Sequence, residues 1–444
     1  MRIIATLLTT LLSFALPAAA GDDLRPQVES ELPPLLSLYR DLHAHPELSR
    51  HEEHTSVVLA GELRKAGYTV TEHLGKYTDG APGYGIVAVM KNGSGPTVLV
   101  RTELDALPVE EKTGAAFAST VRSKNAAGQD VGVMHACGHD LHMMSLLGTA
   151  QALAKLKDRW SGTLLLIGQP AEETVEGARA MLTDGFYARF GRPDYAIALH
   201  NEPTLEAGKV RLVAGPVYAS ATTIEVRIRG VGGHGAHPES TKDPVVMAAE
   251  YVMAIQTIVS RQTLPLEPAV VTVGSIHGGS KNNIIPDEVV LQLTVRAFNE
   301  DVRKNIVASL DRTARGIALA AGVPDDRAPV MKVFDNESVP ATYNDPKLVE
   351  RLHGVFSAAL GKGNVVDMKP IMVSEDFGLF GLDHQIPLTL FLLGTSSAEQ
   401  LQESRRTGKP VPSLHSSEFL PQAEPAMRTG ITATTSAVLD LLKK

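Results

Sequence analysis

The sequence predicts an α/β protein in which a smaller βαββαβ unit is inserted into a larger domain. In the first half of the chain, short apolar strands alternate with helices, which is typical of an α/β sheet. Near Tyr218 the pattern changes to strands of alternating polarity, and the first pattern resumes around Pro346. We therefore expect a larger domain formed by residues 21–217 and 341–444, with a ferredoxin-like domain at 218–340 between its two parts.

Apolar residues at three- and four-residue spacing predict two helices at the start of the larger domain, at 31–44 and 52–66. Pro33 and Pro34 are expected in the opening turn of the first helix, where a missing N–H is tolerated. The remaining elements of this domain share continuous apolar runs or helical periodicity; they are strands at 85–90, 97–102, 163–168 and 195–199, and helices at 141–156 and 347–360.

The inserted segment reads as six elements in the order strand, helix, strand, strand, helix, strand. They are expected at 222–229, 244–261, 270–276, 289–298, 302–321 and 330–336. This order is that of a ferredoxin-like sandwich.

Composition excludes several classes of protein. The formal net charge is −8 and no Lys/Arg-rich run is present, which argues against a nucleic-acid partner. Arg2, an apolar run at 3–16 and the small residues ending at Ala20 resemble a secretory signal peptide at 1–20. No later stretch reaches transmembrane length, so we expect no membrane partner and an exported, periplasmic or secreted protein.

The stretch from His135 to Asp140 gathers a thiol, two imidazoles and a carboxylate, and Cys137 is the only cysteine of the chain. Extended backbone would direct His135, Cys137 and His139 to one side, and a thiolate beside an imidazole is a suitable metal pair. The plainer interpretation is a small buried apolar cysteine flanked by polar histidines. In an oxidising compartment a lone thiol is a liability unless it is buried or metal-bound, which favours the metal interpretation.

Further ligand-type residues follow other predicted strands or lie in loops. Glu172 and Glu173 come directly after the strand at 163–168, where open α/β sheets bind their ligands. One of these carboxylates could bind metal while the other faces a bound water. His200 ends another strand, His415 lies in a C-terminal loop, and Asp105 is placed to hydrogen-bond a ligating imidazole. This inventory fits two metal ions better than one.

Three motifs then make the chain recognisable: residues 134–140 (MHACGHD), 169–173 (QPAEE) and 374–377 (SEDF). With the stretch 43–49 (HAHPELS), they resemble the metal-dependent amidohydrolase and peptidase family of hippurate hydrolase, indole-acetyl-amino-acid hydrolases, aminoacylase-1 and carboxypeptidase G. The similarity is greatest to the hippurate hydrolase branch, and it extends from His43 to His415. It implies a zinc-peptidase-like catalytic domain with an inserted lid and dimerisation domain.

The resemblance also implies roles for individual residues. Cys137 would bridge two divalent metal ions, and the remaining ligands would be His139, Glu173, His200 and His415. Thiolate and imidazole favour zinc, with manganese, cobalt and nickel as alternatives. Glu172 would be the general base and, with Asp105, part of the catalytic machinery; His234 would reach into the active site of the partner in a homodimer.

The implied reaction is hydrolysis of the amide bond of N-acyl amino acids such as hippurate, giving a carboxylic acid and a free amino acid. Asn283 and Arg296 match positions associated with substrate binding. Glu103 departs from the branch, which usually has Asp there, so a role for it is open. Two alternatives remain: a dipeptidase or carboxypeptidase of the same family, and, from another class, an exported solute-binding protein, which would not need these ligands.

Overall fold

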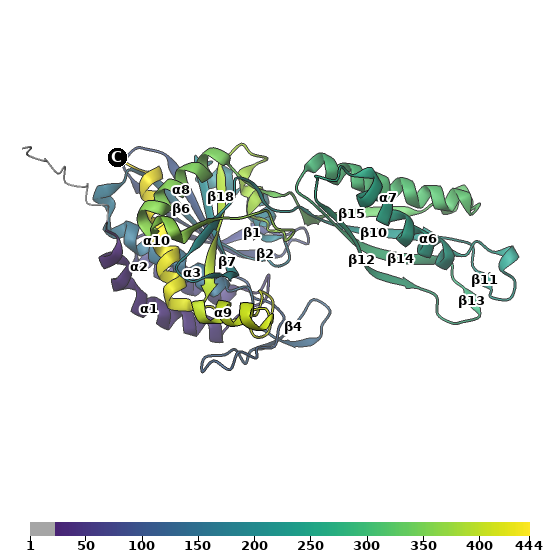
Figure 1. The fold of residues 1–444 in the computed structure, drawn as a ribbon, viewed down its shortest axis with the longest axis horizontal. Coiled ribbons are helices and arrows are strands. Elements are labelled where there is room, and N and C mark those ends of the chain that lie inside the picture. Colours follow the sequence, from purple (N-terminus) through teal and green to yellow (C-terminus); the bar gives the residue numbers. More distant parts are fainter. Residues whose placement is uncertain (1–22) are drawn as a thin grey trace, which may run out of the picture.

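The computed structural model describes residues 23–444, so the expected signal peptide at 1–20 lies outside the described residues. An eight-stranded sheet of order β1-β2-β6-β3-β7-β18-β8-β17 forms the centre of the larger domain (Figure 1). Its strands are β1 (Thr69–Lys76), β2 (Pro82–Asn92), β3 (Thr97–Glu103), β6 (Gly162–Gln169), β7 (Tyr195–Glu206), β8 (Val210–Leu212), β17 (Val365–Asp367) and β18 (Leu388–Ser396). The four neighbours β6, β3, β7 and β18 are parallel, so their carboxyl ends share one edge of the sheet.

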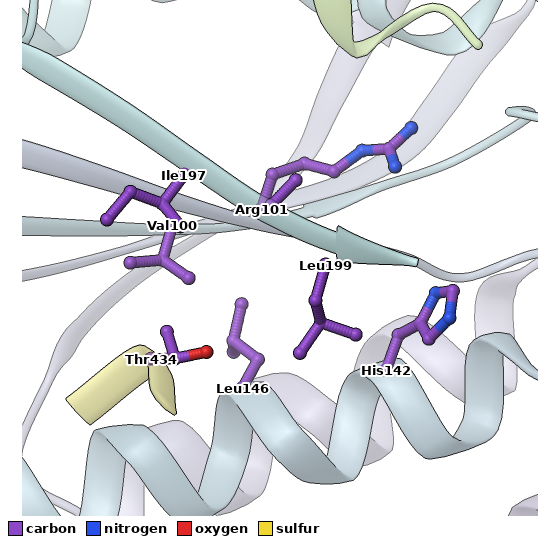
Figure 2. A pocket seen from close by; sticks show the side chains of 8 residues that line it. Val100, Arg101, His142, Leu146, Ile197, Leu199 and Thr434 are labelled. Carbon is purple, nitrogen blue, oxygen red and sulfur yellow. The ribbon is translucent and has the colours of Figure 1, made fainter. Parts of the chain in front are cut away.

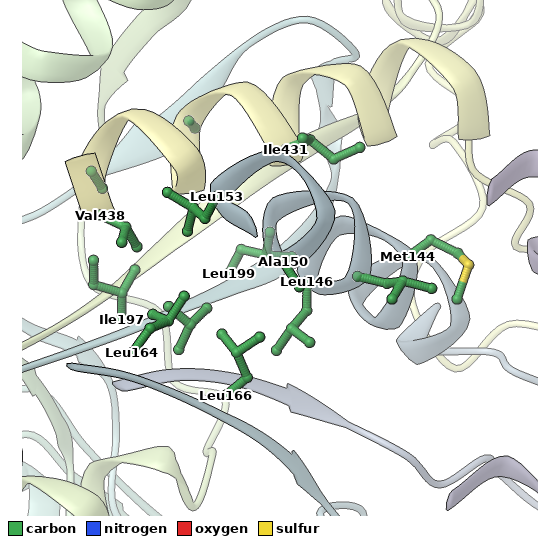
Figure 3. Packing of buried hydrophobic residues seen from close by; sticks show 14 of the residues in the cluster. Met144, Leu146, Ala150, Leu153, Leu164, Leu166, Ile197, Leu199, Ile431 and Val438 are labelled. Atoms are coloured by element: carbon green, nitrogen blue, oxygen red, sulfur yellow. The ribbon is translucent and has the colours of Figure 1, made fainter. Parts of the chain in front are cut away.

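Helices cover both faces of this sheet. They are α1 (Arg25–Ala44), α2 (Glu53–Lys65), α3 (His139–Lys155), α4 (Gly177–Thr183), α5 (Phe186–Phe190), α8 (Pro346–Leu360), α9 (Ala398–Thr407) and α10 (Ala423–Leu441). In the core on one face, Leu146 of α3 and Ile431 of α10 pack with Leu166 and Leu199 of the sheet (Figure 3). Burial on both faces explains why these strands are apolar throughout.

The inserted segment forms a separate antiparallel sheet of order β12-β14-β10-β15, with two helices on one face (Figure 1). Its elements are β10 (Ala221–Arg229), α6 (Pro244–Thr257), β12 (Ala269–Gly278), β14 (Glu288–Ala297), α7 (Glu300–Ala320) and β15 (Val330–Val339). They follow in the predicted βαββαβ order and bury a core of their own. At the end farthest from the large sheet lies a small ribbon of β11 (Gly233–His234) and β13 (Ile284–Ile285).

Short elements complete the fold. The paired strands β9 (Gly215–Tyr218) and β16 (Thr342–Asn344) mark where the chain enters and leaves the inserted segment. The others are β4 (Arg122–Lys124), β5 (Asp130–Gly132), η1 (Lys157–Arg159), η2 (Pro238–Ser240), η3 (Ile258–Gln262), η4 (Asp325–Arg327), η5 (Lys362–Asn364) and η6 (Phe377–Gly381). Among residues 23–444, no helix combines the length and apolarity needed to cross a membrane.

The expectation for Pro33 and Pro34 is wrong. Helix α1 begins at Arg25, so both prolines lie in its interior rather than in its opening turn. Leu24 and Val28 are buried in the core, and their packing extends the helix upstream of the prolines. Tertiary burial thus outweighs the local cost of two missing backbone donors.

Candidate active site

The loop before α3 carries the metal motif and is held by a neighbouring strand. Gly138 has φ 77°, and a Cβ there would lie 2.2 Å from Nδ2 of Asn201, so only glycine fits. The Asn201 amide donates hydrogen bonds to the carbonyls of Cys137 and Gly138, both at 3.0 Å. Because Asn201 directly follows His200 on β7, this contact brings the two ligand-bearing segments together.

Cys137 belongs to two overlapping groups of metal-ligating side chains. Its Sγ lies 3.4 Å from Nε2 of His200, and His139 completes the first group. The second group joins Cys137 to Glu173 and His415, whose Nε2 lies 3.5 Å from Oε2 of Glu173. In each group the ligand atoms lie within 4.8 Å of one another. One thiolate shared between two groups is the arrangement that a metal-bridging ligand requires.

The donor atoms have the chemistry of a metal site. Nδ1 of His139 donates to the main-chain carbonyl of Asp105 at 2.8 Å, so in the neutral ring Nε2 carries no proton and can bind a metal ion. This Nε2 and Oε1 of Glu173 are buried without a hydrogen-bond partner, 3.9 Å apart. Buried acceptors facing one another are costly unless a cation lies between them, so these residues fit divalent metal ions.

Glu172 occupies a different environment from its neighbour. Its carboxylate lies 3.7 Å from Nε2 of His139 and also groups with Glu375 and Asp376. Burial first, and then the negative charge of Glu375, raise the pKa of Glu172 well above its usual value. Because its pKa is raised, this carboxylate has a high affinity for a proton. Its position beside the candidate metal ligands therefore suits it to proton transfer.

A buried cluster of charged side chains lies next to the ligand groups and fixes the position of the acidic residues there. The guanidinium of Arg101 contacts Glu103, Glu375 at 2.6 Å and Asp376 at 3.1 Å. Figure 2 shows a small cavity lined mostly by apolar residues beside Val100, Leu146 and Leu199; His142 lies on the same side of the strands, while the Arg101 side chain extends away across its strand. Cys137, His139, Glu172, Glu173, His200 and His415 are not among the residues that line this cavity.

Glu103 takes part in this support. It accepts a hydrogen bond from Nδ1 of His142 at 2.9 Å, while Nε2 of His142 accepts from the backbone N–H of Asn201 at 3.0 Å. The chain of contacts thus runs from Arg101 to the asparagine that holds Cys137. The sequence left the role of Glu103 open. It also assigned no role to Glu375 and Asp376, although the motif at 374–377 that contains them was recognised.

Asp105 lies close to His139, as expected, but its contact is mainly through the backbone. Its Oδ1 is 3.5 Å from Nδ1 of His139, farther than its own carbonyl oxygen. Its Oδ2 instead accepts from the hydroxyl of Ser49 at 2.7 Å and from the N–H of Glu173 at 2.9 Å. The carboxylate therefore positions Glu173 as well as His139.

The expected convergence of His135 with Cys137 and His139 is wrong. His135 is absent from the ligand groups found among residues 23–444, and both of its ring nitrogens are buried without a hydrogen-bond partner. Burial lowers its pKa to about 4, so the ring is neutral. The loop turns at Cys137 instead of staying extended, because Gly138 adopts a left-handed conformation.

Three predicted residues lie on the inserted domain, away from the ligand groups. His234 and Asn283 are exposed at the β11–β13 ribbon, the end of the molecule farthest from the large sheet (Figure 1). Arg296 lies at the opposite end of this domain, next to Ala297, whose carbonyl accepts from the N–H of Ser220 where the segment begins. One chain thus assembles the ligand set and Glu172 but not His234.

Comparison with known proteins agrees with this geometry. Residues 99–405 match the family model described as peptidase family M20/M25/M40. The chain belongs to this family. It is therefore a metal-dependent amidohydrolase or peptidase.

Several relatives cover most of the chain. Hippurate hydrolase of Campylobacter jejuni is 36% identical over 76% of this chain and 82% of its own length. N-acetyl-L-cysteine deacetylase of Bacillus subtilis is 35% identical, covering 81% of this chain and 80% of the relative. Thermostable carboxypeptidase 1 of Saccharolobus solfataricus is 34% identical, covering 82% and 87%.

A solved structure from Bacillus subtilis, described as a dinuclear metal binding peptidase from the M20 family, superimposes with a TM-score of 0.73. It is 27% identical and covers 93% of this chain and 99% of its own. The predicted family, the α/β fold class and the class of enzyme are thus confirmed.

Proposed function

We propose that this protein hydrolyses the amide bond of N-acyl amino acids, hippurate-like compounds among them, to a carboxylic acid and a free amino acid. The observation that carries the proposal is the pair of ligand groups that share Cys137 and lie beside the buried Glu172. Two of the relatives are named for removing an acyl group from an amino acid, which supports this choice of substrate.

Two divalent metal ions fit the ligand groups. Cys137 would bridge them, and His139, Glu173, His200 and His415 would complete the set. Zinc suits the thiolate and imidazoles best, with manganese, cobalt and nickel as alternatives. When bound, such ions polarise the scissile carbonyl and lower the pKa of a water molecule towards ~7.

The side chain of Glu172 then performs the proton transfers. Its carboxylate accepts the proton of the attacking water and delivers it to the nitrogen of the departing amine. Glu375 and Asp376, held by Arg101, keep the surroundings of Glu172 negative and so favour proton acceptance. The charge that develops on the carbonyl oxygen needs a further donor, a role that we assign to His234 of the partner subunit.

Arg296 is suited to hold the free carboxylate of the substrate. It is half-buried, and among residues 23–444 it has no hydrogen bond or ion pair with another side chain. Burial alone lowers its pKa, because no carboxylate compensates it. A substrate carboxylate would supply that missing partner as a two-pronged acceptor. Asn283 would contact the substrate from the distal ribbon of a second subunit.

We also propose a homodimer formed through the inserted domain. Strand β12 is an edge of its sheet, and large apolar side chains are exposed on β12 and on the neighbouring α6, among them Ile276, Val246 and Met253. Unpaired edges with exposed apolar residues favour association with a second copy. In that dimer the ribbon carrying His234 would extend towards the other subunit.

The second candidate is a dipeptidase or carboxypeptidase, which the similarity to thermostable carboxypeptidase 1 favours. Both candidates need a free carboxylate on the substrate, but only a peptidase needs an acyl group that is itself an amino acid. Export to the periplasm or medium, based on residues 1–20, stays a separate proposal, and secretion of an active fusion would test it.

A comparison of substrates tests the proposed function. We expect kcat/KM for an N-acyl amino acid to exceed that for its C-terminal amide by a factor that corresponds to about 2–5 kcal/mol of transition-state stabilisation, since amidation leaves Arg296 without its partner. A dipeptide with the same C-terminal residue separates the two candidates. Faster hydrolysis of the dipeptide would favour the peptidase, and equal values for acid and amide would contradict the carboxylate contact.

A further inference from the structure

Glu52 is a buried carboxylate that contacts the loop carrying Glu172 and Glu173. It is 0% exposed and lies just before α2, far from these residues in the sequence. Its Oε1 accepts a hydrogen bond from the backbone N–H of Ala171 at 2.7 Å. Ala171 directly precedes Glu172, so Glu52 acts on the backbone from which the paired acids project.

Oε1 of Glu52 accepts hydrogen bonds from two residues whose backbone conformation is unfavourable. Oε1 of Glu52 also accepts from the N–H of Arg50 at 2.8 Å. Arg50 has φ 70° and Ala171 has φ 50°, the left-handed region that residues with a Cβ rarely adopt. Strained backbone of this kind persists only where surrounding contacts enforce it. One carboxylate oxygen thus stabilises a left-handed residue in each of two loops.

The loop that carries Glu172 and Glu173 is closely packed, so its backbone has little space for a different conformation. A Cβ at Gly177 would lie 1.5 Å from the carbonyl oxygen of Pro170, so the two ends of the loop touch. The carbonyl of Ala171 accepts from the N–H of Gly177 at 3.0 Å. A change of φ at Ala171 would rotate the following peptides and redirect Glu172 and Glu173, because all later atoms of the loop depend on that angle.

We propose that Glu52 is a positioning residue, which fixes the left-handed Ala171 and thereby aims Glu172 and Glu173 at the active site. This inference rests on the proposed function, because it takes Glu172 as the proton-transfer group. Its essential feature is the acceptor oxygen, not the negative charge. Among residues 23–444 the second oxygen, Oε2, is buried without a hydrogen-bond partner, so replacing it with an amide nitrogen breaks no existing hydrogen bond.

The test compares Glu52→Gln with Glu52→Ala. Glutamine retains the acceptor oxygen, so we expect its kcat within a few-fold of the wild type. Alanine should lower kcat roughly 10- to 100-fold with KM little changed, as expected for misplaced catalytic groups. In the metal-free protein, hydrogen exchange should become faster in residues 170–177 of the alanine variant only. Equal damage in both variants would overturn the proposal.

Glu47→Ala is the matched control. Glu47 lies in the same segment, but its carboxylate accepts from the N–H groups of His54 and Thr55 at the start of α2, and among the described residues it forms no hydrogen bond or ion pair with residues 170–177. We expect a lower unfolding temperature with unchanged kcat. A kcat loss in this control equal to that of Glu52→Ala would show that general destabilisation explains both, and would contradict the proposal.

A double variant tests the conformational mechanism. Glycine adopts positive φ without strain, so Ala171→Gly should restore part of the kcat lost in Glu52→Ala. No recovery would contradict a role through φ of Ala171. The failure of the proposed function is distinguishable: full activity of Glu172→Gln would remove the proton-transfer role, whereas normal activity of Glu52→Ala beside an inactive Glu172→Gln would remove only the positioning role.

Discussion

Polar side chains are held differently in two regions of the molecule. One region is the edge of the large sheet where the ligand groups lie, and the other is the distal ribbon of β11 and β13 in the inserted domain. At the sheet edge, His139 is fully buried and its ring is oriented by Asp105. On the ribbon, His234 is exposed, and its Nδ1 accepts a hydrogen bond from the N–H of Ala236, two residues away. The first region is preorganised within one chain, whereas the second leaves His234 exposed to solvent.

The largest expected effect comes from the paired acids at the sheet edge. Glu172→Gln should retain metal and lose several orders of magnitude in kcat, because one group serves both proton transfers. Glu173→Gln should instead weaken metal binding, since it removes a ligand from the group of Cys137 and His415. Metal analysis of both purified proteins, beside kcat at saturating metal, separates the roles. The reverse pattern would exchange the two assignments.

The distal ribbon can be tested by mixing inactive subunits. His234→Ala and Glu172→Gln should each be inactive, and random pairing should restore about a quarter of wild-type activity, because one site of each heterodimer is intact. Activity after verified subunit exchange is the measurement. As the control, each variant alone is taken through the same subunit-exchange procedure and should stay inactive. Absence of recovery would place His234 outside the partner's site.

The candidate ligands could be singled out because they lie in one short motif or at predicted strand ends; they are Cys137, His139, Glu172, Glu173 and His200. The family resemblance was needed to assign a separate role to each. The supporting contacts were not predictable, because they join distant segments. Glu52 contacts Ala171, and Arg101 contacts Glu375, only once the chain has folded. Local sequence carries no signal for such pairings.

The fold shows the same distinction. The predicted strands of the large sheet lie within the observed ones, since continuous apolar runs are a local signal. Strand β18 was not predicted, although it is buried along its whole length beside β7. The two internal prolines of α1 misled the prediction of its start, because burial of Leu24 and Val28 is a tertiary effect.

Glu103 provides a smaller test of preorganisation at the sheet edge. Glu103→Asp shortens the side chain between Arg101 and His142, so the buried Nδ1 of His142 loses its acceptor. We expect the free energy of unfolding to fall by about 1–3 kcal/mol, measured by urea titration. Glu225→Asp, at a partly exposed pair with Arg227, is the control and should cost less than ~1 kcal/mol. Equal losses of unfolding free energy in the two variants would show that the buried contacts of Glu103 stabilise the fold no more than the partly exposed pair does.

The smallest expected effect is the pH dependence of stability that the buried His43 gives the larger domain. Nδ1 of His43 lies 2.6 Å from Asp140 and its Nε2 lies 3.2 Å from Glu111. Burial opposes the charged ring, but the hydrogen bonds to both carboxylates outweigh it and raise the pKa of His43 to about 10. The folded state therefore holds this proton at pH values where the unfolded chain releases it.

The sign follows from this difference in bound protons. The stabilisation is complete below the unfolded pKa of ~6.5 and is lost as pH rises towards 10, because the folded state binds more protons in that window. Between pH 7 and 8 we expect the stability advantage of the wild type over His43→Gln to fall by roughly 1 kcal/mol. Urea unfolding of the wild type and of His43→Gln at a series of pH values measures this change. A pH-independent difference for His43→Gln would show that His43 stays neutral, and that packing rather than charge accounts for its contribution to stability.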